Sequence, residues 1–200
     1  MADREGTRRR FLRGLAGFGA AGIAGPAWPQ LAGAAELLLT PACGEDHGPT
    51  PRQTEGPYFT PDSPERAMLR EPGTAGTPIV LAGTVLGRDC RSVSGALVDL
   101  WHCDDAGHYD NRGYGLRGHQ FAGPDGGYRF ETIVPGLYPG RTRHFHVKFQ
   151  APGGPVLTTQ LYFPGEPGNA RDRIFDPALL VAVDDGPTRT ARFDAVLDLG

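Results

Sequence analysis

Glycine and proline interrupt this chain so often that only short regular elements fit between them. Together they occupy 49 of 200 positions, close to a quarter, whereas their average combined share is roughly 12%. Short apolar runs such as 79–81 and 96–98 lie between them, which is typical of strands joined by turns. Apart from the first residues, no segment has a convincing apolar period of 3.6, and no apolar run approaches the roughly 20 residues of a membrane span. The pattern predicts an all-β, antiparallel-rich β-sandwich with long loops.

The same pattern predicts how the chain is divided. A length of 200 residues suffices for one domain with its own core. Proline-rich residues 35–78 are expected to form an extended N-terminal arm, and residues 79–200 the sandwich domain. Residues 104–126 are expected to be one long glycine-rich loop. We expect strands at about 79–88, 96–103, 127–133, 144–150, 157–163, 178–184 and 191–198.

The first 34 residues have the features of an export signal. Five arginines lie within residues 1–13, and a weakly apolar stretch rich in Gly and Ala follows at 14–24. Ala32-Gly33-Ala34 supplies a small-residue cleavage site. The segment Thr7–Arg13 resembles the twin-arginine export motif. We therefore expect a chain exported by that route to the periplasm or the extracellular space; the alternative is a basic tail that binds nucleic acid or nothing.

Charge limits the partners that the remaining chain can have. Residues 35–200 hold 15 basic and 21 acidic residues, with no basic patch long enough for nucleic acid. We expect neither a nucleic-acid partner nor a membrane span, and the sequence leaves open whether the chain forms a homo-oligomer.

Three cysteines, an odd number, are present in the chain. Cys43, Cys90 and Cys103 form no C-x-x-C pair, which disfavours a zinc ribbon. If Cys90 and Cys103 end successive strands of a hairpin, they lie at opposite ends of it. A disulfide from Cys43 to Cys90 or Cys103 is therefore favoured over one between Cys90 and Cys103.

The strongest local chemical signal is the pair His144 and His146 in a predicted strand. Residues two apart share a face of a strand, so the two imidazoles should project together while Phe145, Val147 and Phe149 face the core. Two adjacent imidazoles are half of a metal site. Zinc, copper and iron all use such pairs, and so do histidines that only form hydrogen bonds, so the pair alone leaves the choice open.

Two tyrosines in glycine- or proline-flanked loops are candidate further ligands. Tyr109 lies in Gly107–Asp110, and Tyr138 lies six residues before His144. A phenol with a pKa of about 10 ligates well when a highly charged ion removes its proton, which favours Fe(III). The alternatives are a tyrosine corner for Tyr138 and simple loop packing for Tyr109.

At this point the sequence resembles the intradiol ring-cleavage catechol dioxygenases, especially the protocatechuate 3,4-dioxygenase type. The resemblance covers nearly all of residues 38–199, and the order and spacing of its pieces make it specific. Those pieces are Thr54–Phe59, Gly83–Val85, Gly95–Trp101, Gly107–Tyr109, Asp125–Tyr128, Pro135–Tyr138, Arg141–His146, Leu157–Phe163 and Arg192–Asp194.

The resemblance implies a non-haem Fe(III) cofactor and an oxidoreductase. The implied activity is cleavage of a catechol-type ring with O₂ to a cis,cis-muconate-type diacid. The implied iron ligands are Tyr109, Tyr138, His144 and His146. By resemblance Tyr138 and His144 are axial, and an axial tyrosinate can accept a proton from the substrate as a general base.

The resemblance also supplies residues around the ligands. Arg141 falls on the family's active-site arginine and is expected to stabilise negative charge on the ring. Gln160 falls on a glutamine expected to orient Arg141 or the substrate, with strand packing as the alternative. Trp101 falls on an aromatic residue near the site, and Tyr58 is either at the pocket entrance or an arm residue that packs. The interval between Tyr138 and His144 is shorter than in the protocatechuate enzymes, so we expect a more open pocket rim.

Two other functions compete with this prediction. One is a zinc-dependent hydrolase that uses His144 and His146. The other is a non-catalytic, transthyretin-like binding module. Neither the preferred catechol nor the location of the exported chain, in solution or at a surface, follows from the sequence.

Overall fold

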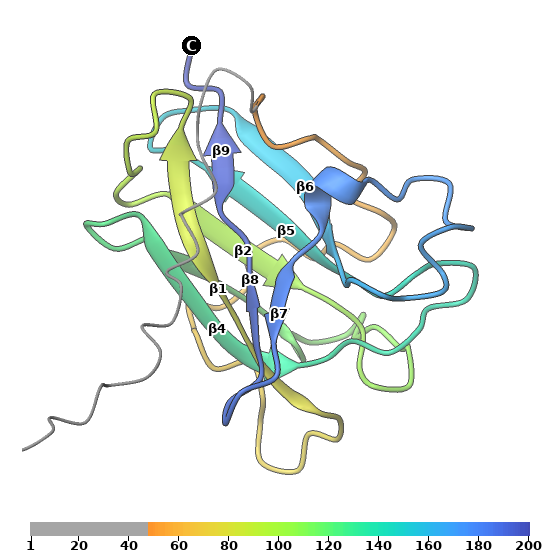
Figure 1. Ribbon diagram of the computed structural model, residues 1–200. Coiled ribbons are helices and arrows are strands. Elements are labelled where there is room, and N and C mark those ends of the chain that lie inside the picture. The colour runs from red at the N-terminus through yellow and green to blue at the C-terminus, as the bar shows by residue number, and fades with distance from the viewer. Residues whose placement is uncertain (1–47) are drawn as a thin grey trace, which may run out of the picture. The chain divides into compact units, whose positions relative to one another are not determined.

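Residues 48–200 are the part of the chain that this computed structural model describes, and they form a β-sandwich (Figure 1). The expected export signal of residues 1–34 and the first part of the arm lie outside these residues. A helix long and apolar enough to cross a bilayer does not occur in the described part of the chain.

Two sheets make up the sandwich, and most of their pairings are antiparallel. The first has the order β4-β1-β8-β7 and also carries β9 on β1; the second has the order β3-β2-β5-β6. β1 pairs in parallel with β8 and β9, and every other named pair is antiparallel. The predicted all-β, antiparallel-rich sandwich is thus confirmed. The strands are β1 Pro78–Gly87, β2 Leu97–Trp101, β3 Arg117–Phe121, β4 Gly127–Ile133, β5 His144–Gln150, β6 Val156–Tyr162, β7 Ala182–Asp184, β8 Thr190–Arg192 and β9 Ala195–Leu197.

The prediction that residues 104–126 form one continuous loop is wrong, because β3 lies within them. Its sequence, Arg-Gly-His-Gln-Phe, has no apolar alternation that would mark a strand. The reason is that the arm covers one face of β3, so polar side chains are buried there: Arg117 is 1% exposed. Arg117 donates hydrogen bonds to the backbone carbonyls of Asp110 and Tyr58.

Both predicted C-terminal strands are wrong in extent. Residues 177–179 form a short 3₁₀ helix, capped by Asp176, whose Oδ1 accepts from the Ala178 N–H at 2.9 Å. Only Ala182–Asp184 is strand, as β7. The predicted strand 191–198 is split at Asp194, whose carboxylate accepts from the Thr84 N–H at 2.7 Å in place of a backbone partner.

The core between the sheets is built from alternate residues of each strand. Phe145, Val147 and Phe149 of β5 are all 0% exposed and belong to the core cluster, which confirms their predicted orientation. The alternate residues His144 and His146 therefore project from the outer face of the β3-β2-β5-β6 sheet. They too are buried, at 3% exposed each, so another part of the chain covers that face.

The cover is the arm. Its backbone bonds to strands far away in sequence: the Gln53 N–H donates to the Thr158 carbonyl at 2.8 Å, and the Arg66 N–H to the His119 carbonyl at 2.9 Å. These two bonds tie the arm to β6 at one edge of the sheet and to β3 at the other. The described arm residues thus cross the outer face of the sheet and bury polar side chains beneath them.

Cys103 is buried and carries a free thiol, so it takes no part in the expected disulfide. Its Sγ lies 3.5 Å from the carbonyl oxygen of Gly136, and burial raises the pKa of the thiol to about 11. The remaining predicted pairing involves Cys43, which lies outside the described residues.

Replacing Phe145 by Ala should lower the free energy of unfolding by about 3–5 kcal/mol, because it leaves a cavity in the sandwich core. Val156→Ala is the matched control, since Val156 lies on the same sheet but is 38% exposed, and it should cost less than about 1 kcal/mol. Urea unfolding measures both; equal losses would contradict this placement of the core.

Candidate metal centre

Two imidazoles on β5 form the centre of the candidate site. His144 and His146 lie on one face of the strand, with their Nε2 atoms 3.1 Å apart and their rings edge to face at a centroid distance of 4.7 Å. The ring of Trp101 on β2 stacks on His146 at 5.0 Å, as the antiparallel register of the two strands requires. The histidine pair is therefore anchored on strands rather than on loops.

A hydrogen bond fixes the tautomer of His144, and burial keeps both imidazoles neutral. His144 Nδ1 lies 2.6 Å from the Thr142 carbonyl oxygen, and a carbonyl only accepts, so Nδ1 carries the proton and Nε2 has the lone pair. Burial lowers the pKa of His144 to about 4 and holds the pKa of His146 well below its usual value. Both imidazoles are therefore neutral at physiological pH, as metal-binding imidazoles must be.

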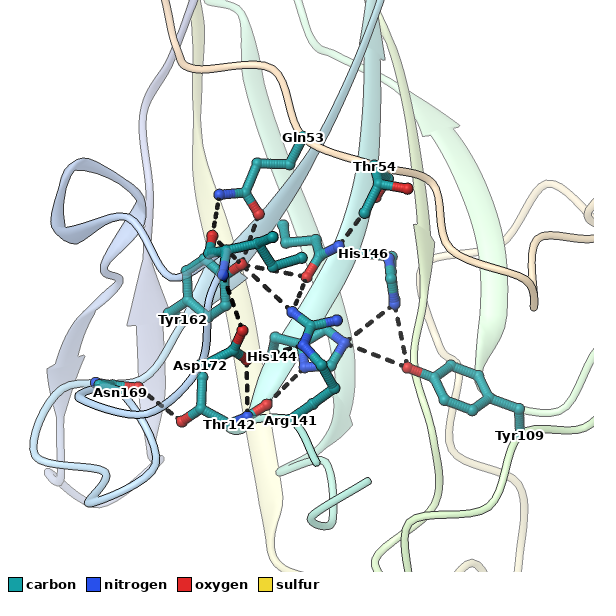
Figure 2. A network of polar contacts seen from close by, with 12 residues as sticks. Gln53, Thr54, Tyr109, Arg141, Thr142, His144, His146, Tyr162, Asn169 and Asp172 are labelled. Carbon is teal, nitrogen blue, oxygen red and sulfur yellow. Dashed lines mark hydrogen bonds and ion pairs between the residues drawn. The ribbon is translucent and has the colours of Figure 1, made fainter. Parts of the chain in front are cut away.

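Tyr109 brings a phenol oxygen to the same point. Its hydroxyl lies 3.2 Å from His146 Nε2 and 3.5 Å from His144 Nε2 (Figure 2). Burial raises the pKa of Tyr109, so the phenol stays protonated unless a nearby positive charge removes the proton. Three polar atoms from two separate parts of the chain thus converge within 3.5 Å of one another.

Tyr138 joins this cluster through a third tyrosine. Its hydroxyl lies 2.8 Å from that of Tyr58, whose ring stacks on Tyr109 at 4.5 Å. The rings of Tyr109 and Tyr138 are 5.9 Å apart. Tyr138 therefore lies beside the His144–His146–Tyr109 group, but its hydrogen bond goes to Tyr58 rather than to a histidine. Tyr58, which the sequence left as either an entrance or a packing residue, is part of the cluster.

The two loops that carry Tyr109 and Tyr138 interlock through glycines. A Cβ on Gly136 would lie 2.5 Å from the Asp105 carbonyl oxygen, and one on Gly107 would lie 2.4 Å from that of Leu137. Gly107 also has φ +86°, which L side chains rarely adopt. The glycines flanking the tyrosines thus allow a backbone contact that fixes both rings.

A polar network behind His144 holds Arg141 in place. Arg141 Nε donates to Asp172 at 2.8 Å, and its terminal nitrogen donates to Gln160 Oε1 at 2.6 Å (Figure 2). Gln160 is fully buried and donates from its amide to the Thr54 carbonyl at 2.9 Å. This geometry shows Gln160 in contact with Arg141, one of the two arrangements expected for it.

Asp172 is the residue of this network that sequence reasoning missed. Its side chain is 2% exposed, while that of Arg141 is 21% exposed. Burial alone would raise its pKa, but hydrogen bonds from the Thr142 N–H and Arg141 hold the pKa of Asp172 below its usual value. Asp172 lies in the loop after β6, and no sequence pattern links that loop to Arg141; only the folded chain brings them together.

The arm closes the site from the solvent side. Gly56, with φ +72°, leaves room for His146: a Cβ there would lie 3.2 Å from His146 Cε1. Phe59 packs edge to face on Trp101 at 4.9 Å, and the Lys148 ammonium lies 3.2 Å from the Phe59 ring centre. The arm segment Thr54–Phe59, one of the pieces that carry the family resemblance, thus covers the two histidines.

These residues fit a hard, highly charged metal ion. His146 Nε2, His144 Nε2 and the Tyr109 hydroxyl converge on one point, while the other ring nitrogen of His146, Nδ1, is buried without a hydrogen-bond partner among the described residues. Within residues 48–200 no group of three His, Cys, Asp or Glu side chains converges. The third donor that faces the histidines is a phenol, which suits Fe(III) better than zinc.

Known proteins are similar to this chain in both sequence and fold. A family model described as Dioxygenase matches residues 54–185. The hydroxyquinol 1,2-dioxygenase of Nocardioides simplex is 31% identical over 194 residues, covering 76% of this chain and 66% of its own length. The protocatechuate 3,4-dioxygenase beta chain of Burkholderia cepacia is 31% identical over 152 residues, covering 61% of this chain and 65% of its own. This chain thus spans just under two thirds of the length of these two curated relatives.

Among solved structures, the dioxygenase domain of a dioxygenase–carbohydrate-binding protein fusion from Streptomyces sp. SirexAA-E is similar with a TM-score of 0.74. That domain is 58% identical, and the match covers 76% of this chain and all of that one. Fold and site together define a β-sandwich with a buried histidine–tyrosine cluster. With the family match added, the chain belongs to the intradiol ring-cleavage dioxygenases.

Replacing Gly136 by Ala should force the two tyrosine-bearing loops apart, because the new methyl group meets backbone at 2.5 Å. We expect weaker iron binding by at least about tenfold, measured by competition with a chelator. Gly186→Ala is the control, since its Cβ would meet nothing closer than 3.5 Å. Equal iron affinity in the two variants would contradict the interlocked-loop geometry.

Proposed function

We propose that the chain is a non-haem Fe(III) dioxygenase that cleaves a catechol-type ring between its two hydroxyl-bearing carbons, with O₂, to a cis,cis-muconate-type diacid. The observation that carries the proposal is the convergence of Tyr109, His144 and His146 beside Tyr138. Family membership supports it, as do relatives named hydroxyquinol and catechol 1,2-dioxygenases. We propose Tyr109, Tyr138, His144 and His146 as the iron ligands.

Iron, when bound, would hold the catecholate and make its ring reactive toward O₂. The side chains around it would handle protons and charge. A catechol must lose two protons to chelate a metal, one of which would be taken up by a hydroxide ion and leave as water. Tyr138 as tyrosinate can accept the other at its hydroxyl oxygen, and the Tyr58 hydroxyl, 2.8 Å away, can hydrogen-bond to the resulting phenol. Tyr58 would thus hold Tyr138 beside the site after it has taken the proton.

Arg141 supports the negative charge that develops on the ring. Asp172 and Gln160 fix its guanidinium from two sides, and hydrogen bonds formed in advance cost no reorganisation when the charge develops. The Asp172 carboxylate also neutralises the positive charge of Arg141, whose side chain is only 21% exposed. We therefore propose Arg141 as catalytic and Gln160 as the residue that positions it.

The two rival functions make different demands on the same residues. A zinc hydrolase would need a ligand of zinc's usual kind beside the histidines, where the structure has the Tyr109 phenol. A transthyretin-like binding module would need neither two inward-facing lone pairs nor a paired arginine behind them. The observed arrangement therefore favours the dioxygenase.

We further propose that the chain is exported by the twin-arginine route to the periplasm or the extracellular space. The proposal rests on the sequence of residues 1–34, which lie outside the described part. A route that exports folded proteins suits a site buried beneath the arm, since the metal can be loaded first.

Loaded with Fe(III), the purified chain should be burgundy, because charge transfer from tyrosinate to iron absorbs visible light. Tyr109→Phe should remove most of the visible band, while Tyr114→Phe, a change at a half-exposed tyrosine outside the cluster, should leave it intact. Oxygen uptake with catechol, hydroxyquinol and protocatechuate, with identification of the ring-opened product, tests the reaction. A colourless, iron-replete protein would contradict the proposed ligands.

Arg141→Ala should keep the iron and its colour but lower kcat by about 10²–10³-fold, the usual cost of losing one charge-stabilising group. Gln160→Ala should lower kcat less, and should add almost nothing in the Arg141→Ala background, because it acts through that arginine. Arg129→Ala, at an exposed ion pair with Glu131, is the control. Independent, multiplicative losses from Arg141→Ala and Gln160→Ala would refute the positioning role.

A further inference from the structure

A cavity of about 500 Å³ lies on the outer face of the β3-β2-β5-β6 sheet, apart from the histidine–tyrosine cluster. We call it the arm-side cavity. Its lining includes Asp62 and Ser63 of the arm, Leu97 and Asp99 of β2, and His119 and Phe121 of β3. The residues of the candidate metal centre do not line it, so the function proposed above leaves it unexplained.

The sheet register places the arm-side cavity beside the candidate metal centre but not within it. Trp101 is paired with His146, and Leu97, four residues earlier on β2, is paired with Gln150. At about 3.4 Å per residue these two rows lie about 14 Å apart. The row between them pairs Asp99, which lines the cavity, with Lys148. The Lys148 ammonium lies over the Phe59 ring and 2.5 Å from Glu55 Oε2.

The polar groups of the cavity are hydrogen-bond acceptors. Ser63 Oγ donates to Asp99 Oδ1 at 2.9 Å and lies 3.1 Å from His119 Nδ1. Because the one hydroxyl proton goes to Asp99, His119 donates from Nδ1 and has a lone pair on Nε2 when neutral. Asp99 is only 9% exposed, and among the described residues Ser63 is its only side-chain hydrogen-bond donor. Its second oxygen is therefore available to a ligand.

Two more acceptors complete the polar side. Gln150 uses its amide nitrogen to donate to the Gly154 carbonyl at 2.9 Å, which leaves its oxygen open. The Asp62 carboxylate has no hydrogen bond or ion pair with any described residue. A ligand for this cavity must therefore bring several donors, and an anion would be repelled by two carboxylates.

The cavity is apolar next to these acceptors, in the register row that holds Leu97 of β2 and Phe121 of β3. Phe121 is 54% exposed, although it is a large aromatic side chain on a regular strand, and Leu97 and Pro152 line the same cavity. An apolar wall beside a set of acceptors matches a molecule with one apolar face and hydroxyl donors around its edge. A sugar ring has this shape, whereas a small ammonium ion would use the acceptors but not the wall.

The walls of the cavity are set by the backbone before any ligand arrives. The His119 N–H donates to the Pro64 carbonyl at 3.0 Å, which fixes the arm against β3, and the Gly95 N–H donates to the Ala122 carbonyl at 2.9 Å. A preformed site avoids the cost of ordering loops on binding. We propose that the arm-side cavity binds one pyranose ring of an oligosaccharide, with Phe121 against the sugar face and Asp99 accepting from its hydroxyls.

Calorimetric titration of the full chain with cellotetraose, xylotetraose and chitotetraose tests this proposal. At least one should bind saturably, with a Kd of about 1 mM or tighter. Phe121→Ala and Asp99→Asn should each weaken binding by about tenfold or more. Met68→Ala is the matched control, since Met68 is another apolar side chain, 48% exposed, outside the cavity, and it should leave binding unchanged.

Three outcomes would overturn the proposal. They are no saturation by any of the three sugars up to about 10 mM, binding of putrescine in place of a sugar, and sugar binding that survives both Phe121→Ala and Asp99→Asn. Binding is measured without turnover, so the result is independent of the dioxygenase proposal. Phe121→Ala should leave oxygen uptake with catechols unchanged, which also shows that this variant is folded.

Discussion

The structure around the candidate site depends on one constraint: two imidazoles are buried edge to face where neither can easily be charged. Their Nε2 atoms are 3.1 Å apart, and burial depresses both pKa values. Two lone pairs at that distance repel unless a proton or a cation lies between them. Thr142 fixes the proton of His144 on the far nitrogen, so the positive group between the two Nε2 atoms is either a proton on His146 Nε2 or a bound metal ion.

Every neighbouring element helps to keep that pair buried and oriented. The core packing of Phe145, Val147 and Phe149 fixes β5, and alternation then places both histidines on the outer face of the sheet. The arm covers the histidines on that face, and the interlocked loops bring in the two tyrosines. Polar side chains are consequently buried between the arm and the outer face of the sheet. The arm and this face together also line the arm-side cavity.

The sequence predicted the features that depend on residues close together in the chain. Alternation along β5 predicted the direction of each side chain, and the turn residues predicted the sandwich. It missed β3 because the arm, a distant segment, buries Arg117 and so removes the apolar alternation that marks a strand. It missed Asp172 and could not place Tyr58 for the same reason: their partners, Arg141 and Tyr138, lie far away in sequence and meet them only after folding.

Resonance Raman scattering, excited within the visible band of the iron-loaded chain, tests most directly whether tyrosine and histidine hold Fe(III) together. The account predicts enhanced ring vibrations of two distinguishable iron-bound tyrosinates, one set of which is lost in Tyr109→Phe and the other in Tyr138→Phe. Iron bound at His144 and His146 without any enhanced tyrosinate vibration would contradict it.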